Sequence, residues 1–134
     1  MGYIGKHNNI QLLTAATAVN GVPSGATAGV VVNLQGSDDA LFALKSTAGS
    51  GVMTVTVRLW GYSRAAADWM PLGSGTGASK GILNAQTAID ETGTDLLRHL
   101  EVISGMRHVD RVYAEITAIG GTATAVSAWL EGTV

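Results

Sequence analysis

The 134-residue chain lacks cysteine, so it can form neither a disulfide framework nor a thiolate zinc site. It also lacks any window approaching eighteen consecutive apolar residues, which argues against a membrane helix. Its first residues, MGYIGKHNNIQ, contain no long apolar run, so we expect no secretory signal. These features together favour synthesis in a cytoplasm and no membrane partner.

Charge is also scarce. Charged residues make up 13% of the chain, about half the usual share, and the formal net charge is −2. No basic stripe is visible, so we expect no nucleic-acid partner. A surface with few charges is typical of a protein that covers much of itself with neighbours, because a monomer usually keeps more charge for solubility. We therefore expect a homo-oligomer.

Glycine, alanine, threonine and valine are abundant, with 18 glycines in all. Small, β-tolerant residues with frequent glycines suit a sheet protein with many tight turns. The length fits one domain with a substantial core. We predict an all-β fold, an antiparallel and jelly-roll-like β-sandwich of about eight strands over residues 10–134, preceded by a flexible arm at 1–9.

The segment 38–62, DDALFALKSTAGSGVMTVTVRLWGY, has apolar residues at every second position on both sides of a glycine-containing loop. This pattern predicts a β-hairpin. If Thr47 faces Val52, then Leu44 faces Val55 and Phe42 faces Val57 on one apolar side.

A second hairpin is predicted over 109–131, with its turn at Gly120-Gly121. With Ile119 opposite Thr122, one side is small and apolar. That side collects Val112, Ala114, Ile116, Ala118, Ala123, Ala125, Ser127 and Trp129. The opposite side mixes polar and apolar residues, as expected of a sheet face that meets a neighbour.

Five further strands are expected, at 10–19, 28–34, 68–73, 82–89 and 97–103. Pro71 places the third of them at an edge or a bend. The segment 95–103 also fits a helical face through its leucines, but its end at Gly105 favours a strand.

The sequence contains no motif that identifies a catalytic site. It has no Gly-x-Ser-x-Gly elbow, and its histidines lack metal-ligand spacing. The stretch 73–77 has glycine at alternate positions but not the order of a phosphate-binding loop. Residues 90–95 hold three carboxylates, in a spacing that does not match a calcium loop, so a solvated turn is favoured. We expect no enzyme activity, no cofactor and no metal.

One group of side chains is a candidate interface, because arginine, tryptophan and tyrosine dominate contact energies between proteins. Two alternatives stay open for this group: it contacts a partner, or Trp60 and Tyr62 fold beneath a loop. The candidate residues are Arg58, Trp60, Tyr62, Arg111, Tyr113 and Glu115.

The stretches VTVRLWGYS, DWMPLG and HVDRVYAEITAIGGTATAVSAWLEG give the chain a family likeness over roughly residues 40–131. This combination resembles small structural proteins of tailed-bacteriophage virions. The resemblance implies a non-enzymatic, oligomeric β-sandwich, often a trimer in such proteins, that decorates or cements the capsid. Its partners would be further copies of itself and the major capsid protein, and its location the virion, after synthesis in the host bacterial cytoplasm.

Two other functions remain open. A tail, neck or head-fibre component would share these sequence features. A carbohydrate-binding module would instead stack Trp60, Tyr62 and Trp69 on sugar rings.

Overall fold

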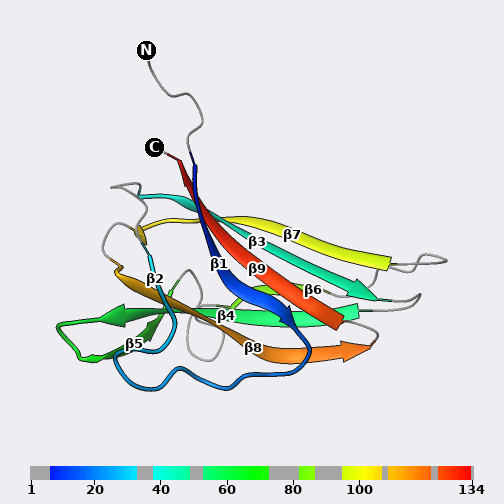
Figure 1. Ribbon diagram of the computed structural model, residues 1–134, viewed down its shortest axis with the longest axis horizontal. Coiled ribbons are helices and arrows are strands. Elements are labelled where there is room, and N and C mark those ends of the chain that lie inside the picture. Colours follow the sequence, from blue (N-terminus) through cyan, green and yellow to red (C-terminus); the bar gives the residue numbers. More distant parts are fainter. Residues whose placement is uncertain are drawn as a thin grey trace, which may run out of the picture.

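Two antiparallel sheets face each other in the computed structural model, and no helix occurs among the residues that it describes (Figure 1). The described residues are 7–32, 38–48, 53–72, 82–86, 95–106, 109–121 and 124–133. Nine strands lie within these ranges. They are β1 (His7–Ala16), β2 (Val30–Val31), β3 (Ala40–Ala48), β4 (Met53–Ser63), β5 (Asp68–Pro71), β6 (Ile82–Gln86), β7 (Asp95–Ile103), β8 (Arg111–Gly121) and β9 (Thr124–Thr133).

Sheet A has the strand order β1-β9-β3-β7, and sheet B has the order β2-β8-β4-β5, with β6 also paired to β4. The strands β5 and β6 lie end to end along the same edge of β4, because β5 pairs with its last residues and β6 with its middle. If these two are counted as one strand position, the order matches the jelly-roll arrangement of two four-stranded sheets. The all-β sandwich predicted from the sequence is therefore confirmed.

The predicted hairpin over 38–62 is wrong as a pairing. The strand β3 pairs with β7 and β9 in sheet A, whereas β4 pairs with β8, β5 and β6 in sheet B. The apolar sides were nevertheless identified correctly, since Phe42 and Leu44 are buried, as are Val55 and Val57. These residues meet across the core between two sheets instead of lying side by side within one.

The predicted hairpin over 109–131 is wrong for the same reason, because β8 lies in sheet B and β9 in sheet A. On β8 the predicted inward residues Val112, Ala114 and Ile116 are indeed buried. On β9 the assignment was reversed. The fully buried residues of β9 are Val126, Ala128 and Leu130, not Ala125, Ser127 and Trp129.

A β-bulge shifts the alternation of β9. Lys45 of β3 faces Ser127, but Thr47 faces Thr124, so β9 has one residue more than β3 in this interval. Ala125 in the bulge has a φ of 52°, a left-handed conformation that is uncommon for alanine. Since one extra residue reverses which side chains point inward, counting from the glycine turn gave the wrong face.

The other expected strands are found with altered limits. The ambiguous segment 95–103 is the strand β7, and Pro71 ends the edge strand β5. The strand β1 begins at His7, so the last three residues of the predicted arm pair with β9, while residues 1–6 lie outside the described residues. The glycine-rich stretch 73–77 and the turn 90–94 lie outside them as well.

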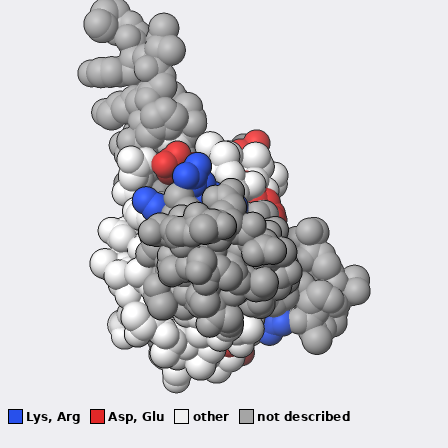
Figure 2. Space-filling model, turned by 90° about the vertical axis from the view of Figure 1, so that its right-hand side faces the viewer, with Lys and Arg blue, Asp and Glu red and all other residues white. Residues whose placement is uncertain are grey.

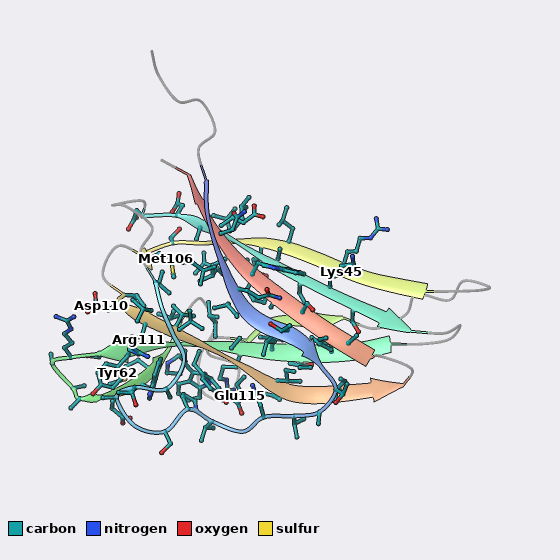
Figure 3. All side chains as sticks on the ribbon, in the orientation of Figure 1. Lys45, Tyr62, Met106, Asp110, Arg111 and Glu115 are labelled. Atoms are coloured by element: carbon teal, nitrogen blue, oxygen red, sulfur yellow. The ribbon has the colours of Figure 1, made fainter. Side chains whose placement is uncertain are left out.

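Buried residues from both sheets form one core cluster, and Met106, just after β7, is also part of it (Figure 3). Full burial of a large aliphatic or aromatic side chain contributes about 1.5–3 kcal/mol. The largest fully buried side chains are Phe42, Leu44, Leu59, Met106, Ile116 and Leu130.

The corrected orientation of β9 is testable by mutation. Leu130→Ala is expected to lower the free energy of unfolding by about 2–5 kcal/mol, because it leaves a cavity in the core. The matched change Val22→Ala removes a side chain that is 63% exposed and should cost no more than about 0.5 kcal/mol. Urea denaturation measures both values, and equal losses would contradict the inward orientation of Leu130.

Candidate interaction surfaces

The six candidate interface residues lie together on the outer face of sheet B. They come from the paired strands β4 and β8, where Arg58 faces Glu115 and Trp60 faces Tyr113. Val57 and Leu59, which alternate with the candidate residues along β4, are buried in the core. The candidate residues therefore point away from the core. The sequence pattern thus grouped residues that the fold does bring side by side.

Arg58, Trp60 and Glu115 form a chain of contacts on this face. The indole Nε1 of Trp60 donates a hydrogen bond of 2.9 Å to Oε1 of Glu115. The guanidinium carbon of Arg58 lies 5.7 Å from the centre of the Trp60 ring, within the range of a cation–π contact. Glu115 is almost fully buried in this arrangement, at 8% exposure. These three side chains therefore stabilise one another within the chain.

The segment 17–29 covers part of the same face. In Figure 1 it leaves the end of β1, passes beneath sheet B and returns to β2. The side chain of Asn20 fixes it to β8, donating from Nδ2 to the carbonyl of Ala114 and accepting at Oδ1 from the amide of Ile116. Because β2 pairs with β8 at only two residues, Asn20 satisfies backbone groups of β8 that a longer β2 would have paired.

Arg111 and Tyr113 hold the two ends of this segment. The Arg111 guanidinium donates to the carbonyls of Thr27 and Ala28 at 2.8 and 3.0 Å. The Tyr113 hydroxyl lies 3.2 and 3.1 Å from the carbonyl oxygens of Asn20 and Gly21. Two of the six candidate residues are thus engaged by the chain's own backbone. A role for the six residues in contacting a partner stays a prediction.

Trp69 of β5 lies beneath this covering segment with 5% exposure. Its ring packs edge-on against Tyr62 and Tyr113, with centroids 5.3 and 6.2 Å away. Its Nε1 donates to the carbonyl of Gly25 at 2.9 Å. A buried ring cannot stack on a sugar. Trp69 therefore cannot serve as a stacking residue of a carbohydrate-binding module.

Two hollows of about 340 and 240 Å³ lie beside Tyr62, at the end of sheet B. Both are lined by Arg64 and Asp110, whose side chains form an exposed ion pair of 2.7 Å. Exposed ion pairs of this kind contribute little to stability, typically about 0–1 kcal/mol. Of the charged groups that line the hollows, Arg64 and Asp110 pair with each other, and Arg111 is bonded to the carbonyls of Thr27 and Ala28.

The outer face of sheet A was not identified from the sequence. On β7 the alternate residues Leu100 and Val102 are 63% and 59% exposed. The registers place Trp129, Ala43 and Leu100 in one row across β9, β3 and β7. A shallow hollow of about 410 Å³ lies along this row. The alternation of Arg98, Leu100 and Val102 was visible in the sequence, but nothing there indicated which side faces the core.

Among the described residues, no three histidine, aspartate or glutamate side chains are grouped as a metal site would require. Within the same residues no helix is long and apolar enough to cross a membrane. The carboxylate turn at 90–95 is described only at Asp95, so its relation to a cation stays untested.

Comparison with known proteins gives no further guide to these surfaces, because the chain matches no family model, no curated protein and no solved structure.

Gly29 offers a test of how tightly the segment 17–29 is held. Its φ is +71°, and a methyl group there would collide with the carbonyl oxygen of Val112 and press on the Trp69 ring. We expect Gly29→Ala to lower the free energy of unfolding by about 2 kcal/mol or more, from backbone strain and the collision together. Gly21→Ala is the control, since Gly21 has a similar φ of +75° but open space around it.

Urea denaturation of both variants measures the difference. Strain alone should cost the Gly21 variant about 1 kcal/mol. Equal losses in the two variants would show that the close approach of Gly29 to β8 is not maintained in solution.

The pH dependence of stability tests the Tyr113 contact. Burial raises the pKa of Tyr113 above its ordinary value of 10.0, and the negative charge of Glu115 raises it further. A pKa that is higher in the folded than in the unfolded chain contributes stability that is complete below about pH 10 and is lost as pH rises through the folded-state pKa.

We therefore expect the free energy of unfolding of the wild type to be about 1 kcal/mol higher than that of Tyr113→Phe at neutral pH. This is the usual contribution of one hydrogen bond. The difference should be constant between pH 7 and 9 and shrink above pH 10. Urea denaturation of both proteins across this range checks it, and a difference that grows in alkali would contradict the burial of the hydroxyl.

Proposed function

We propose that this chain is a non-enzymatic structural protein of a tailed-bacteriophage virion, which self-associates and decorates or cements the capsid shell. The virion assignment rests on the sequence resemblance over residues 40–131. The assembly assignment rests on the surface of the folded chain.

The observation that carries the assembly proposal is the contrast between the two outer faces. The outer face of sheet B is partly covered by the segment 17–29, through hydrogen bonds from Arg111, Tyr113 and Asn20. The outer face of sheet A leaves Leu100 and Val102 well exposed, and Leu100 lines the same shallow hollow as Trp129. Adjacent apolar residues exposed on one sheet face are typical of an interaction site, because leaving them in water is unfavourable.

The fold and the composition support the same proposal. Many viral capsid proteins are jelly rolls, and so are lectins and other proteins. The fold therefore agrees with a capsid role but does not by itself identify it. Figure 2 shows one end of the molecule, on which charged atoms are few among the described residues. Few charges also favour contact between copies, because little hydration must be removed from the joined surfaces.

In this function the sandwich acts mechanically. Its core holds two rigid sheets about 10 Å apart, so contacts on either outer face transmit load through a packed interior. The capsid shell and sister subunits would be the partners, and the virion would be the site of action.

Binding to phage capsid shells tests the proposal. Purified chain is added to shells of its phage that have been assembled without it, and bound protein is counted after sedimentation. We expect saturable binding in a fixed ratio to the major capsid protein, and cryo-EM density at equivalent positions on the shell. Shells that already carry the protein are the control and should bind no more.

Absence of binding, together with absence of the chain from purified virions, would contradict the proposal. Density at a tail, neck or head fibre would replace the decoration role with another virion role.

A further inference from the structure

The outer face of sheet A has an apolar centre, which we call the sheet A patch. Its members come from β3, β7 and β9, and their positions follow from the strand registers. They are Leu41, Ala43, Leu100, Val102 and Trp129. Leu100 and Val102 are each more than half exposed, and Leu41, Ala43 and Trp129 are partly exposed, so the described part of the chain leaves this patch accessible.

Opposite charges lie at the two ends of the sheet A patch. Lys45 and Arg98 face each other in the row on one side of the Trp129–Ala43–Leu100 row. Glu131 faces Leu41 in the row on the other side. Among the described residues none of these three side chains takes part in an ion pair. Lys45 projects away from the sandwich in Figure 3.

We propose that the sheet A patch binds the same patch of a second copy, face to face, about a two-fold axis that runs across the strands along the Trp129–Ala43–Leu100 row. This inference deepens the proposed function and rests on its claim of self-association. It names the surface and the partner that the claim requires.

The arrangement is self-complementary. Rotation about this axis lays the central row of one copy over the central row of the other, so Leu100 and Trp129 meet apolar side chains. The same rotation lays the row of Lys45 and Arg98 over the row of Glu131 in the second copy. Stacked sheets lie about 10 Å apart at an angle near −30°, a separation that a long lysine side chain spans.

The charge pattern is what identifies a second copy as the occupant. A two-fold interface uses the same surface on both partners, so each charge must meet its opposite after rotation. Lys45 at one end and Glu131 at the other, on the adjacent strands β3 and β9, satisfy this condition around an uncharged centre. Within one chain Lys45 and Glu131 are four residues apart along the strand direction, roughly 13 Å, too far to pair with each other.

Sedimentation velocity of the full chain over a range of concentrations tests the apolar part. The wild type is expected to show a dimer or a larger species built from it. Leu100→Glu should raise the dissociation constant about tenfold or more, because it buries a charge at the centre of the interface. Val22→Glu is the matched control, since Val22 is equally exposed at 63% but lies in the segment beneath sheet B, and it should change nothing.

Charge exchange tests the orientation. Lys45→Glu and Glu131→Lys should each weaken association about threefold to tenfold, because each places like charges together. The double variant with both changes should return to the wild-type dissociation constant, since the pairs are re-formed with reversed signs. Circular dichroism of each variant verifies that the sandwich is folded.

A wild type that stays monomeric at all concentrations would overturn the inference. So would equal effects of Leu100→Glu and Val22→Glu, or a double variant that associates more weakly than both single variants.

Two results separate this inference from the proposed function. If a monomeric wild type still binds capsid shells and Leu100→Glu abolishes that binding, the patch binds the shell. The second-copy inference then fails while the proposed function stands. If the dimer is broken by Leu100→Glu but neither protein binds shells or occurs in virions, the inference stands and the proposed function fails.

Discussion

The inward-facing side chains of four central strands have to meet across the space between two sheets, and the rest of the fold depends on this contact. Phe42 of β3 and Leu130 of β9 belong to sheet A, whereas Val57 of β4 and Ile116 of β8 belong to sheet B. Because consecutive strands supply opposite sides of the core, the connections from β3 to β4 and from β8 to β9 pass from one sheet to the other. The glycine pair at the end of β8 therefore precedes a crossing between layers instead of a hairpin turn.

A core arranged in this way leaves two outer faces, and they differ in how much of each is covered by the chain's own segments. On sheet B it places the segment 17–29, held by Asn20 at the edge of β8 and by the side chains of Arg111 and Tyr113. On sheet A it leaves an apolar patch with opposite charges at its two ends. The aromatic and arginine residues that suggest an interface in the sequence are in part engaged by the chain itself, and the more exposed apolar residues lie on the opposite side of the molecule.

Much of the fold could be predicted from alternation along the strands. The period of two correctly identified the strands and the buried sides of β3 and β4, because it reports only whether a side chain faces the core. It does not report which strand lies beside which, since a hairpin and a crossing between sheets bury the same residues. The face of β9 was missed because the bulge at Ala125 depends on a left-handed alanine, for which the sequence carries no signal.

The candidate surfaces were predictable to a lesser extent. Arg58, Trp60 and Tyr62 were grouped correctly with the residues of β8. The reason is that β4 and β8 pair without a register shift between Val57 and Gly61. The covering of Tyr113 was not predictable, since it depends on the backbone of Asn20 and on Gly29, which lies within the strand expected at 28–34. Leu100 and Val102 were overlooked because the sequence of β7 does not show which of its two sides faces the core. Its pairing with β3 determines that side.

The central claim is that the molecule associates through sheet A and not through sheet B. Hydroxyl-radical footprinting of the chain, compared between dilute and associated samples, measures this contact at individual side chains. We predict that the oxidation rates of Leu100 and Trp129 fall on association, while those of Trp60 and the exposed Met70 of β5 stay unchanged. Protection of Trp60 and Met70 with unchanged rates at Leu100 and Trp129 would contradict the claim.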